Sequence, residues 1–371
     1  MDLFDLAPKE SPSALFGRGR ELEELCRFVR AGRWVVLLGP RMVGKTSLVK
    51  AARHRLGLPG AYVNLWGVNS IKGLTEGLIA GINENVSLRA RIAHAIRRVD
   101  GFGVGPGGVS VTTAQPKLRG VWDLLNVLGS ETRESLVVLD EVQELSSVSG
   151  RLLKLLGNIF NTHPRVRFVF TGSLVGLSRT LVEPEARSPL FGRAPVAMTL
   201  SPFDPDTAGE FLRRGLRESG RSLTPAELSE VLAGPLDGTP GWLTLFGNHL
   251  TVRGWTPIRA LAETVREGVR VADEEIGHFL EQRDRRLYWP ALRALALRSP
   301  WSVVRTYIEQ DLGRPVNDAT VQRVLRALES SYLARRTEAG YELVDPMVRA
   351  FVLQARRPPG RPGARRTGAH R

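Results

Sequence analysis

The chain of 371 residues is poor in cysteine, in histidine and in long apolar runs. Its single cysteine, Cys26, excludes an intrachain disulfide and a metal site built on several cysteines. Its six histidines show no spacing typical of metal ligands. The longest apolar runs, such as 34–38 and 136–139, are far too short to cross a bilayer. We therefore expect no membrane partner.

The N-terminus lacks the features of a secretory signal. The first five residues include Asp2 and Asp5, and no basic region followed by an apolar stretch comes after them. Hydrophobic residues make up 42% of the chain and charged residues 24%, which is the balance of a globular protein with a sizeable core. We expect a cytoplasmic protein of two or three domains.

Only six lysines occur, and one of them, Lys45, lies in a loop typical of phosphate binding. Residues 39–46 match G-x-x-x-x-G-K-[ST] at every fixed position, between an apolar strand and a helix. Glycines let backbone N–H groups turn toward phosphate oxygens, and the helix N-terminus adds partial positive charge. The predicted binding residues for the phosphates of a nucleotide are Gly39, Pro40, Arg41, Met42, Val43, Gly44, Lys45, Thr46 and Ser47.

Two acids follow an apolar strand at 136–139, about a hundred residues after this loop. Asp140 matches a Walker B aspartate, and we expect its strand to lie beside the strand that feeds the loop. Asp140 and Thr46 are then the predicted ligands of Mg²⁺, which prefers hard oxygen donors. Glu141 is predicted to polarise the attacking water, and Lys45 to contact the β- and γ-phosphates. The alternative is that both acids only begin a loop or cap the next helix.

Further candidates lie near the ends of the two strands that follow. Thr171 and Ser173 end the strand at 167–173, and one of them is expected to hydrogen-bond the γ-phosphate or the attacking water, unless both only turn the chain. Arg193 is a candidate for neutralising charge in phosphoryl transfer, on its own chain or on a neighbouring copy. A surface or interdomain ion pair is the alternative for Arg193. Pro195, early in the next strand, favours the edge of a sheet.

The alternation of strands and helices over residues 1–202 predicts an α/β fold, with a parallel sheet covered by helices on both faces. Residues 203–282 show only helical periodicity and predict a small helical lid. Residues 283–355 predict three helices and a hairpin, which is the order of a winged-helix domain. Residues 356–371 are rich in proline, glycine and arginine and predict a disordered basic tail.

Positive charge is concentrated in the C-terminal part. Residues 283–371 hold 18 arginines against 8 acids, which is +10 of the net +14 of the whole chain. Arg323 and Arg326 fall on the third predicted helix, Arg335 and Arg336 fall on the hairpin, and six more arginines lie in the tail. These residues form a candidate DNA-binding face. Packing against a protein, with a tail that only increases solubility, is the alternative.

Together these segments resemble the archaeal-type P-loop ATPases of the STAND/AAA+ group. The resemblance covers nearly all of residues 14–353, and its motifs are FGR followed by Glu21, GPRMVGKTSL, LVVLDEVQEL, FTGS, SPLFGRA, LSPFD, GTPGWLTLFG and YELVDPMVRAFV. It implies a five-stranded core, a helical lid and a winged helix. It also implies that Phe16, Gly17 and Arg18 lie near the adenine and that Pro240 of the lid packs against the base.

The resemblance further implies that nucleotide closes the lid and reorients the winged helix. We therefore expect an ATP-hydrolysing switch that needs Mg²⁺ and turns over slowly alone. Two other functions stay open. One is an ATP-regulated DNA-binding protein that uses residues 283–371, and the other is a scaffold whose assembly with a protein partner, or with further copies of the chain, is controlled by ATP.

Overall fold

The computed structural model describes residues 3–96, 101–105, 107–112, 118–172, 177–281, 283–331, 333–355 and 358–359. The chain divides into two compact units, which are described separately. The first, named here the core unit, comprises Ala7–Gly39 and Gly44–Leu200. The second, named the helical unit, comprises Met1–Leu6, Pro40–Val43 and Ser201–Arg371.

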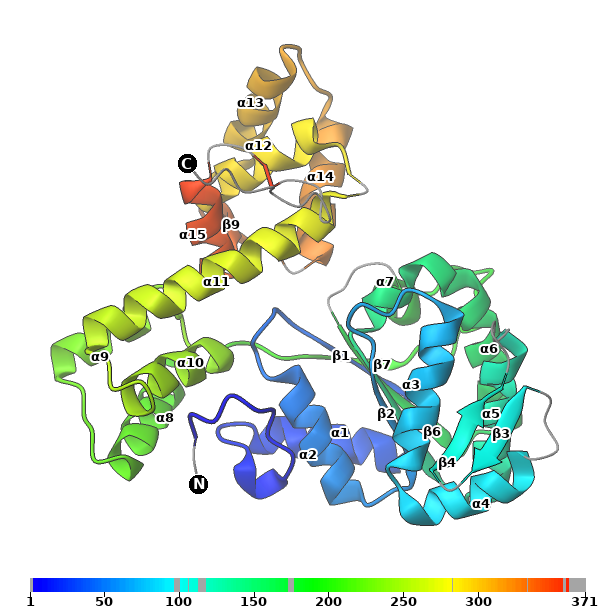
Figure 1. Cartoon of the computed structure of the whole chain (residues 1–371). Coiled ribbons are helices and arrows are strands. Elements are labelled where there is room, and N and C mark those ends of the chain that lie inside the picture. Colours follow the sequence, from blue (N-terminus) through cyan, green and yellow to red (C-terminus); the bar gives the residue numbers. More distant parts are fainter. Residues whose placement is uncertain are drawn as a thin grey trace, which may run out of the picture. The chain divides into compact units, whose positions relative to one another are not determined.

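The core unit is built on a five-stranded parallel sheet (Figure 1). The strand order is β2-β5-β6-β1-β7, with bounds β1 Val35–Leu38, β2 Gly60–Asn64, β5 Ser135–Asp140, β6 Val166–Gly172 and β7 Val196–Thr199. The three inner strands are buried along their whole length. Helices cover both faces of a parallel sheet, so its inner strands are shielded from water on both sides. The apolar side chains on both faces of these strands suit that environment.

The strand order differs from the sequence expectation at one point. The strand that ends in Asp140 does not lie beside the strand that feeds the phosphate loop, because β6 lies between them and pairs with both. Apolar runs locate strands along the chain, but the order in a sheet depends on how each crossover packs, and no local pattern encodes it. The prediction from Pro195 is confirmed, since β7 lies at an edge of the sheet and pairs with β1.

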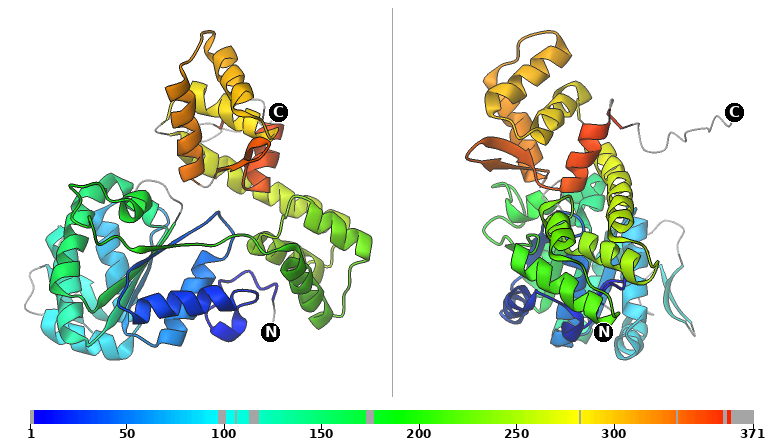
Figure 2. Two further views of the ribbon diagram at one scale, coloured as in Figure 1. Left: turned by 180° about the vertical axis from the view of Figure 1, so that it is seen from behind. Right: turned by 90° about the vertical axis from the view of Figure 1, so that its left-hand side faces the viewer.

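Seven helices described in the core unit flank its sheet (Figures 1 and 2). They are α1 Gly19–Arg30, α2 Lys45–Leu56, α3 Ile71–Asn83, α4 Val86–Ile96, α5 Leu118–Glu131, α6 Ser149–Thr162 and α7 Leu177–Val182. Two of these helices, α3 and α4, follow each other directly after β2. Asn85 separates them, because its Oδ1 accepts a hydrogen bond of 3.0 Å from the Leu88 N–H and so caps α4. A short antiparallel hairpin follows, formed by β3 Phe102–Gly105 and β4 Gly108–Val111.

The helical unit begins with four helices: α8 Pro205–Glu218, α9 Pro225–Ala233, α10 Pro240–Thr251 and α11 Pro257–Leu280. Each starts with proline, whose fixed φ suits the first turn of a helix. Asp204 and Thr224 cap two of them by accepting N–H groups of the first turn. In the part of the chain that the structure describes, no helix is both long and apolar enough to span a bilayer.

The C-terminal part of this unit contains three helices and a hairpin, followed by one more helix. They are α12 Arg285–Ala296, α13 Trp301–Leu312, α14 Asp318–Ser330, β8 Ala334–Thr337, β9 Gly340–Leu343 and α15 Pro346–Gln354. Three helices followed by a hairpin is the order expected for a winged helix. The last helix, α15, packs against α11 and α12 and so ties this part to the preceding helices of the unit.

The N-terminal arm, residues 3–6, is anchored in the helical unit by Phe4. The side chain of Phe4 is 1% exposed, and its ring packs edge-on against Phe211 at 5.7 Å between centroids. A Cβ atom at Gly215 or Gly247 would lie 2.3 or 2.2 Å from the Phe4 ring. Asn248 Nδ2 also donates a hydrogen bond of 3.0 Å to the Phe4 carbonyl. The two glycines therefore form a socket that only an aromatic ring from the arm fills.

Candidate nucleotide site

The phosphate loop links β1 to α2, as the sequence predicts. Gly44 adopts φ +98° at the N-cap of α2, a conformation that suits glycine. Met42 adopts φ +60°, which costs a residue with a side chain about 1–3 kcal/mol. Lys45 is 7% exposed, and its Nζ donates a hydrogen bond of 2.9 Å to the Gly39 carbonyl. The loop therefore holds its lysine close to its own backbone.

Asp140 lies at the carboxyl end of β5 and is 2% exposed. Thr46 Oγ1 donates a hydrogen bond of 2.8 Å to Asp140 Oδ2, so the two predicted Mg²⁺ ligands are in direct contact even though β6 separates their strands. The Thr171 hydroxyl donates to Asp140 Oδ1. The carboxylate thus accepts hydrogen bonds on both oxygens, and its orientation is fixed from two sides.

Glu141 follows Asp140 in a strained backbone conformation. Its φ is +60°, a left-handed value that is uncommon for glutamate. Its N–H donates to Thr171 Oγ1 at 3.1 Å, and its carboxylate accepts a hydrogen bond of 2.5 Å from Gln143 Nε2. Strain of this kind persists only where surrounding contacts maintain it, and it is concentrated at functional sites. The turn directs Glu141 away from the line of β5, which a proposed general base requires.

The structure describes two of the three remaining catalytic candidates, Thr171 and Arg193, and does not describe Ser173. Ser173 lies outside the described residues, whereas Thr171 is buried and contacts both Asp140 and Glu141. Arg193 is exposed, donates to Asn161 Oδ1 and lies 5.7 Å above the ring of Phe160. Neither Asn161 nor Phe160 belongs to the predicted nucleotide site, so a role for Arg193 in charge neutralisation stays a prediction.

The segment predicted to lie near the adenine precedes α1. Gly17 adopts φ +64°, and Arg18 is 6% exposed. Arg18 Nη1 donates a hydrogen bond of 2.8 Å to Glu21 Oε1, which explains why the FGR motif is followed by a glutamate. Phe16 belongs to the same turn. Adenine binding by these residues stays a prediction.

The lid turn that carries Pro240 contacts the tip of the phosphate loop within the helical unit. Gly241 N–H donates a hydrogen bond of 2.8 Å to the Met42 carbonyl. A Cβ atom at Gly241 would lie 2.8 Å from the Met42 carbonyl oxygen and side chain, so only glycine allows this approach. Pro240 begins α10 directly before this contact. The Gly-x-Pro-Gly pattern therefore builds a close backbone contact.

A magnesium ion fits the donor set at this site. Thr46 supplies a hydroxyl oxygen and Asp140 a carboxylate oxygen, both hard ligands at the start of a helix that follows a phosphate loop. Mg²⁺ usually takes only one or two protein ligands and completes its shell with waters and phosphate oxygens. The two residues are therefore a sufficient protein contribution.

Two residues of the site were not predicted from the sequence. Tyr62 of β2 donates a hydrogen bond of 2.5 Å to Asp140 Oδ2, and Gln143 holds Glu141. Tyr62 lies 78 positions before Asp140, and no motif joins them. Its one sequence signal is a hydroxyl-bearing residue in a short strand of mostly apolar residues.

Comparisons with known proteins agree with this geometry. The profile of a family described as an ATPase domain predominantly from Archaea matches residues 15–246. A search of curated proteins gives no match. Among solved structures, the Walker-type ATPase PABY2304 of Pyrococcus abyssi is 29% identical with a TM-score of 0.76, covering 95% of this chain and 99% of that one. The ORC2 protein of Aeropyrum pernix is 17% identical with a TM-score of 0.49, covering 95% and 98%.

Proposed function

Because the chain belongs to the family of ATPase domains found predominantly in Archaea, we propose that it is a Mg²⁺-dependent, ATP-hydrolysing switch of the STAND/AAA+ type. The observation that carries the proposal is the hydrogen bond of 2.8 Å from Thr46 to Asp140. It joins the phosphate loop to the acid of a second strand at the carboxyl edge of the sheet, where α/β proteins bind ligands.

Each residue of the site has a separate task in this proposal. The backbone N–H groups of residues 41–46 and the Lys45 ammonium bind the phosphates. Thr46 and Asp140 hold Mg²⁺, which supplies positive charge next to the phosphate oxygens. Glu141 orients the attacking water and accepts its proton, while the Gln143 amide keeps the Glu141 carboxylate in place.

The switch begins at the tip of the loop. Residues Pro40–Val43 group with the helical unit, and Met42 accepts the Gly241 N–H. The same four residues would order around phosphate. Nucleotide binding then changes the free energy of the contact with the lid, and the lid responds to the state of the phosphates. In this proposal the lid, residues 203–282, and the C-terminal domain, residues 283–355, move relative to the core.

The catalytic part is tested with two variants and a fluorescent ATP analogue. Lys45→Ala should lose nucleotide binding. Glu141→Gln should bind nucleotide but hydrolyse ATP at least about 100-fold more slowly, because a missing general base typically costs that much. Normal turnover by Glu141→Gln would show that the base has been assigned wrongly.

The switching part is tested by fluorescence energy transfer between a label in the lid and a label in the core. The Glu141→Gln variant is used, so that ATP stays intact during the measurement. We expect different transfer efficiencies with ATP and with ADP. Identical efficiencies with both nucleotides would contradict the switch while leaving the ATPase assignment intact.

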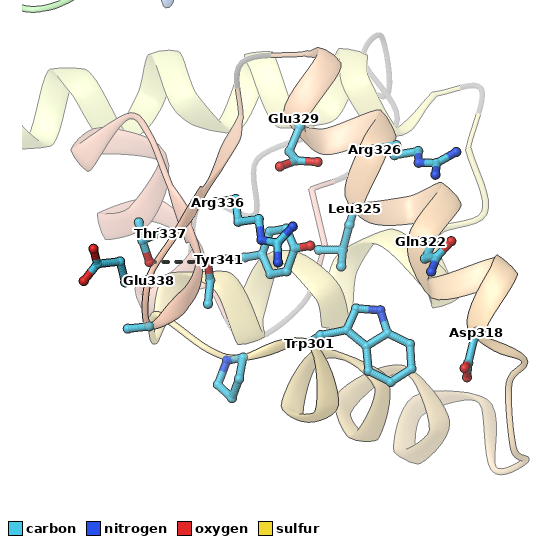
Figure 3. A pocket seen from close by; sticks show the side chains of 13 residues that line it. Trp301, Asp318, Gln322, Leu325, Arg326, Glu329, Arg336, Thr337, Glu338 and Tyr341 are labelled. Atoms are coloured by element: carbon cyan, nitrogen blue, oxygen red, sulfur yellow. Dashed lines mark hydrogen bonds between the residues drawn. The ribbon is translucent and has the colours of Figure 1, made fainter.

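Binding of DNA is a second candidate function, and the groove in Figure 3 is the observation that favours it. This groove has a volume of about 670 Å³ and lies between α14 and the β8–β9 hairpin. Arg326 of α14 and Arg336 of the hairpin line it, and Trp301 lies along its base. Two cations beside an aromatic ring suit a nucleic acid strand. Asp318, Glu329 and Glu338 also line the groove, so its acids outnumber its two arginines and weaken its attraction for phosphate.

The DNA candidate predicts a salt-dependent affinity for duplex DNA. The double variant Arg326→Ala/Arg336→Ala should bind more weakly and show a smaller slope of log affinity against log salt, because each lost phosphate contact reduces the slope by about 0.9. Arg214→Ala, a change on α8, is the matched control. Equal retention of all three proteins on a duplex column would dispose of this candidate.

A scaffold whose assembly ATP controls is the third candidate. It predicts that the mass of the particle in solution changes between ADP and a non-hydrolysable ATP analogue. Light scattering in both nucleotides measures this directly. A monomer in both conditions would exclude self-assembly driven by nucleotide.

A further inference from the structure

Tyr62 lies on the strand next to the one that ends in Asp140. In the parallel pairing of β2 with β5, Tyr62 is opposite Val138 and Asn64 is opposite Asp140. Side chains two residues apart on a strand share one face of the sheet. Tyr62 therefore reaches along this face past its own register partner, and its hydroxyl donates a hydrogen bond of 2.5 Å to Asp140 Oδ2. A shorter side chain at this position would not reach.

The hydrogen bond from Tyr62 ends on the same oxygen as the one from Thr46. Thr46 Oγ1 donates to Asp140 Oδ2 at 2.8 Å, and Thr171 donates to Oδ1. Three hydroxyl groups from three separate elements thus hold one carboxylate. Of these, only Tyr62 is neither in the phosphate loop nor next to the proposed base. Its hydroxyl therefore acts on the carboxylate alone.

The phenol is itself held in place by α2. Lys50 lies four residues after Thr46, on the same face of the helix, and its Nζ is 5.3 Å from the centre of the Tyr62 ring. Glu10 accepts a hydrogen bond of 2.8 Å from Lys50 and fixes that amine.

We propose that Tyr62 is a positioning residue of the metal site, whose hydroxyl sets the orientation in which the Asp140 carboxylate meets Mg²⁺. This inference rests on the proposed function, because it needs the metal to bind beside Thr46. Partners that orient a metal ligand contribute to metal affinity although they never touch the ion. A role limited to packing would instead require only the aromatic ring, which phenylalanine also supplies.

Manganese serves as the probe, because its electron paramagnetic resonance signal reports the free ion. Mn²⁺ is titrated into the full chain with a non-hydrolysable ATP analogue, for wild type, Tyr62→Phe and the matched control Tyr341→Phe from the hairpin. Nucleotide binding is measured separately in EDTA. We expect Tyr62→Phe to weaken Mn²⁺ binding about tenfold or more and to leave metal-free nucleotide binding unchanged.

Three outcomes would overturn the inference, and they can be told apart. Equal Mn²⁺ affinity in wild type and Tyr62→Phe would show that the hydroxyl does not position the metal ligand, with the proposed function untouched. If Tyr62→Phe weakened nucleotide binding in EDTA as much as it weakens Mn²⁺ binding, Tyr62 would support the fold of the site and not the metal ligand. Failure of the wild type to retain Mn²⁺ with nucleotide would refute the proposed function, and the inference with it.

Discussion

The backbone N–H of Gly241 donates to the carbonyl of Met42, which links the lid turn directly to the tip of the phosphate loop. The two backbones approach so closely because residue 241 has no side chain. An added Cβ atom would lie 2.8 Å from the Met42 carbonyl oxygen, inside van der Waals contact. Met42 itself adopts a left-handed conformation at φ +60°.

Gly241→Ala should therefore separate the lid turn from the loop. Overpacking of this kind costs about 1–3 kcal/mol, so we expect a lower midpoint of urea unfolding together with altered affinity for ATP relative to ADP. Gly150→Ala is the matched control, because a Cβ atom at that helical glycine meets nothing within 4 Å. If Gly241→Ala kept the wild-type ratio of ATP to ADP affinity, the contact between Gly241 and Met42 would not couple the loop to the nucleotide state.

Glu141→Gly separates backbone strain from chemistry at the site. Glycine adopts a φ of +60° without cost, so the variant should gain about 1 kcal/mol in unfolding free energy while it loses ATP turnover. Arg298→Gly is the matched control, since Arg298 has φ +56° but lies in the C-terminal part of the chain. The Arg298→Gly variant should have a higher free energy of unfolding and hydrolyse ATP at the wild-type rate. A less stable Glu141→Gly protein would argue against strain at this position.

Asp345, the N-cap of α15, should make the helical unit less stable as pH rises. Burial raises the pKa of Asp345 from 3.8 to about 6, although its hydrogen bond from Met347 N–H and the charge of Arg41 oppose the shift. Because the pKa is higher in the folded state, protonation of Asp345 favours folding. This contribution to the free energy of unfolding is complete below pH 3.8 and is lost as pH rises through 6.

Asp345→Asn keeps the helix cap and removes the buried charge. We expect the variant to be more stable than wild type by about 2–3 kcal/mol above pH 7, with the difference vanishing near pH 4. Thermal unfolding across this range measures it. A constant difference between Asp345→Asn and wild type at all pH values would exclude buried charge as the cause.

Phe4 should contribute strongly to stability despite its place four residues from the N-terminus. Removal of a fully buried phenylalanine side chain costs about 3–5 kcal/mol, so Phe4→Ala should lower the unfolding free energy of the helical unit by that amount. Leu6→Ala is the control, because Leu6 is 57% exposed. Equal stability of the two variants would show that the arm is dispensable.

The parts that were predictable from the sequence depend on local spacing. The phosphate loop requires glycine, lysine and threonine within eight residues, and Asp140 follows an apolar strand directly. The strands were predicted in the same way, from short runs of apolar residues. These features are fixed by neighbouring residues, and the structure places Thr46 and Asp140 in contact.

The parts that were not predictable depend on residues far apart in the chain. The position of β6 between β5 and β1 follows from crossover packing, and the contact of Tyr62 with Asp140 follows from that sheet. The left-handed conformation of Glu141 breaks local preference, and the tertiary contact of its N–H with Thr171 helps to maintain it. The N-terminal arm has no periodicity, and only the Gly215 and Gly247 socket explains its burial.

The helical unit gathers three separate stretches of the polypeptide, residues 1–6, 40–43 and 201–371. No single scissile bond divides the protein into its two units, and neither unit is encoded by one uninterrupted stretch of gene. Limited digestion at residue 200 would leave the C-terminal fragment incomplete, because residues 1–6 and 40–43 of its unit would stay on the other piece. A helical unit transferred as the single stretch 201–371 would likewise lack the Met42 carbonyl that accepts the Gly241 N–H.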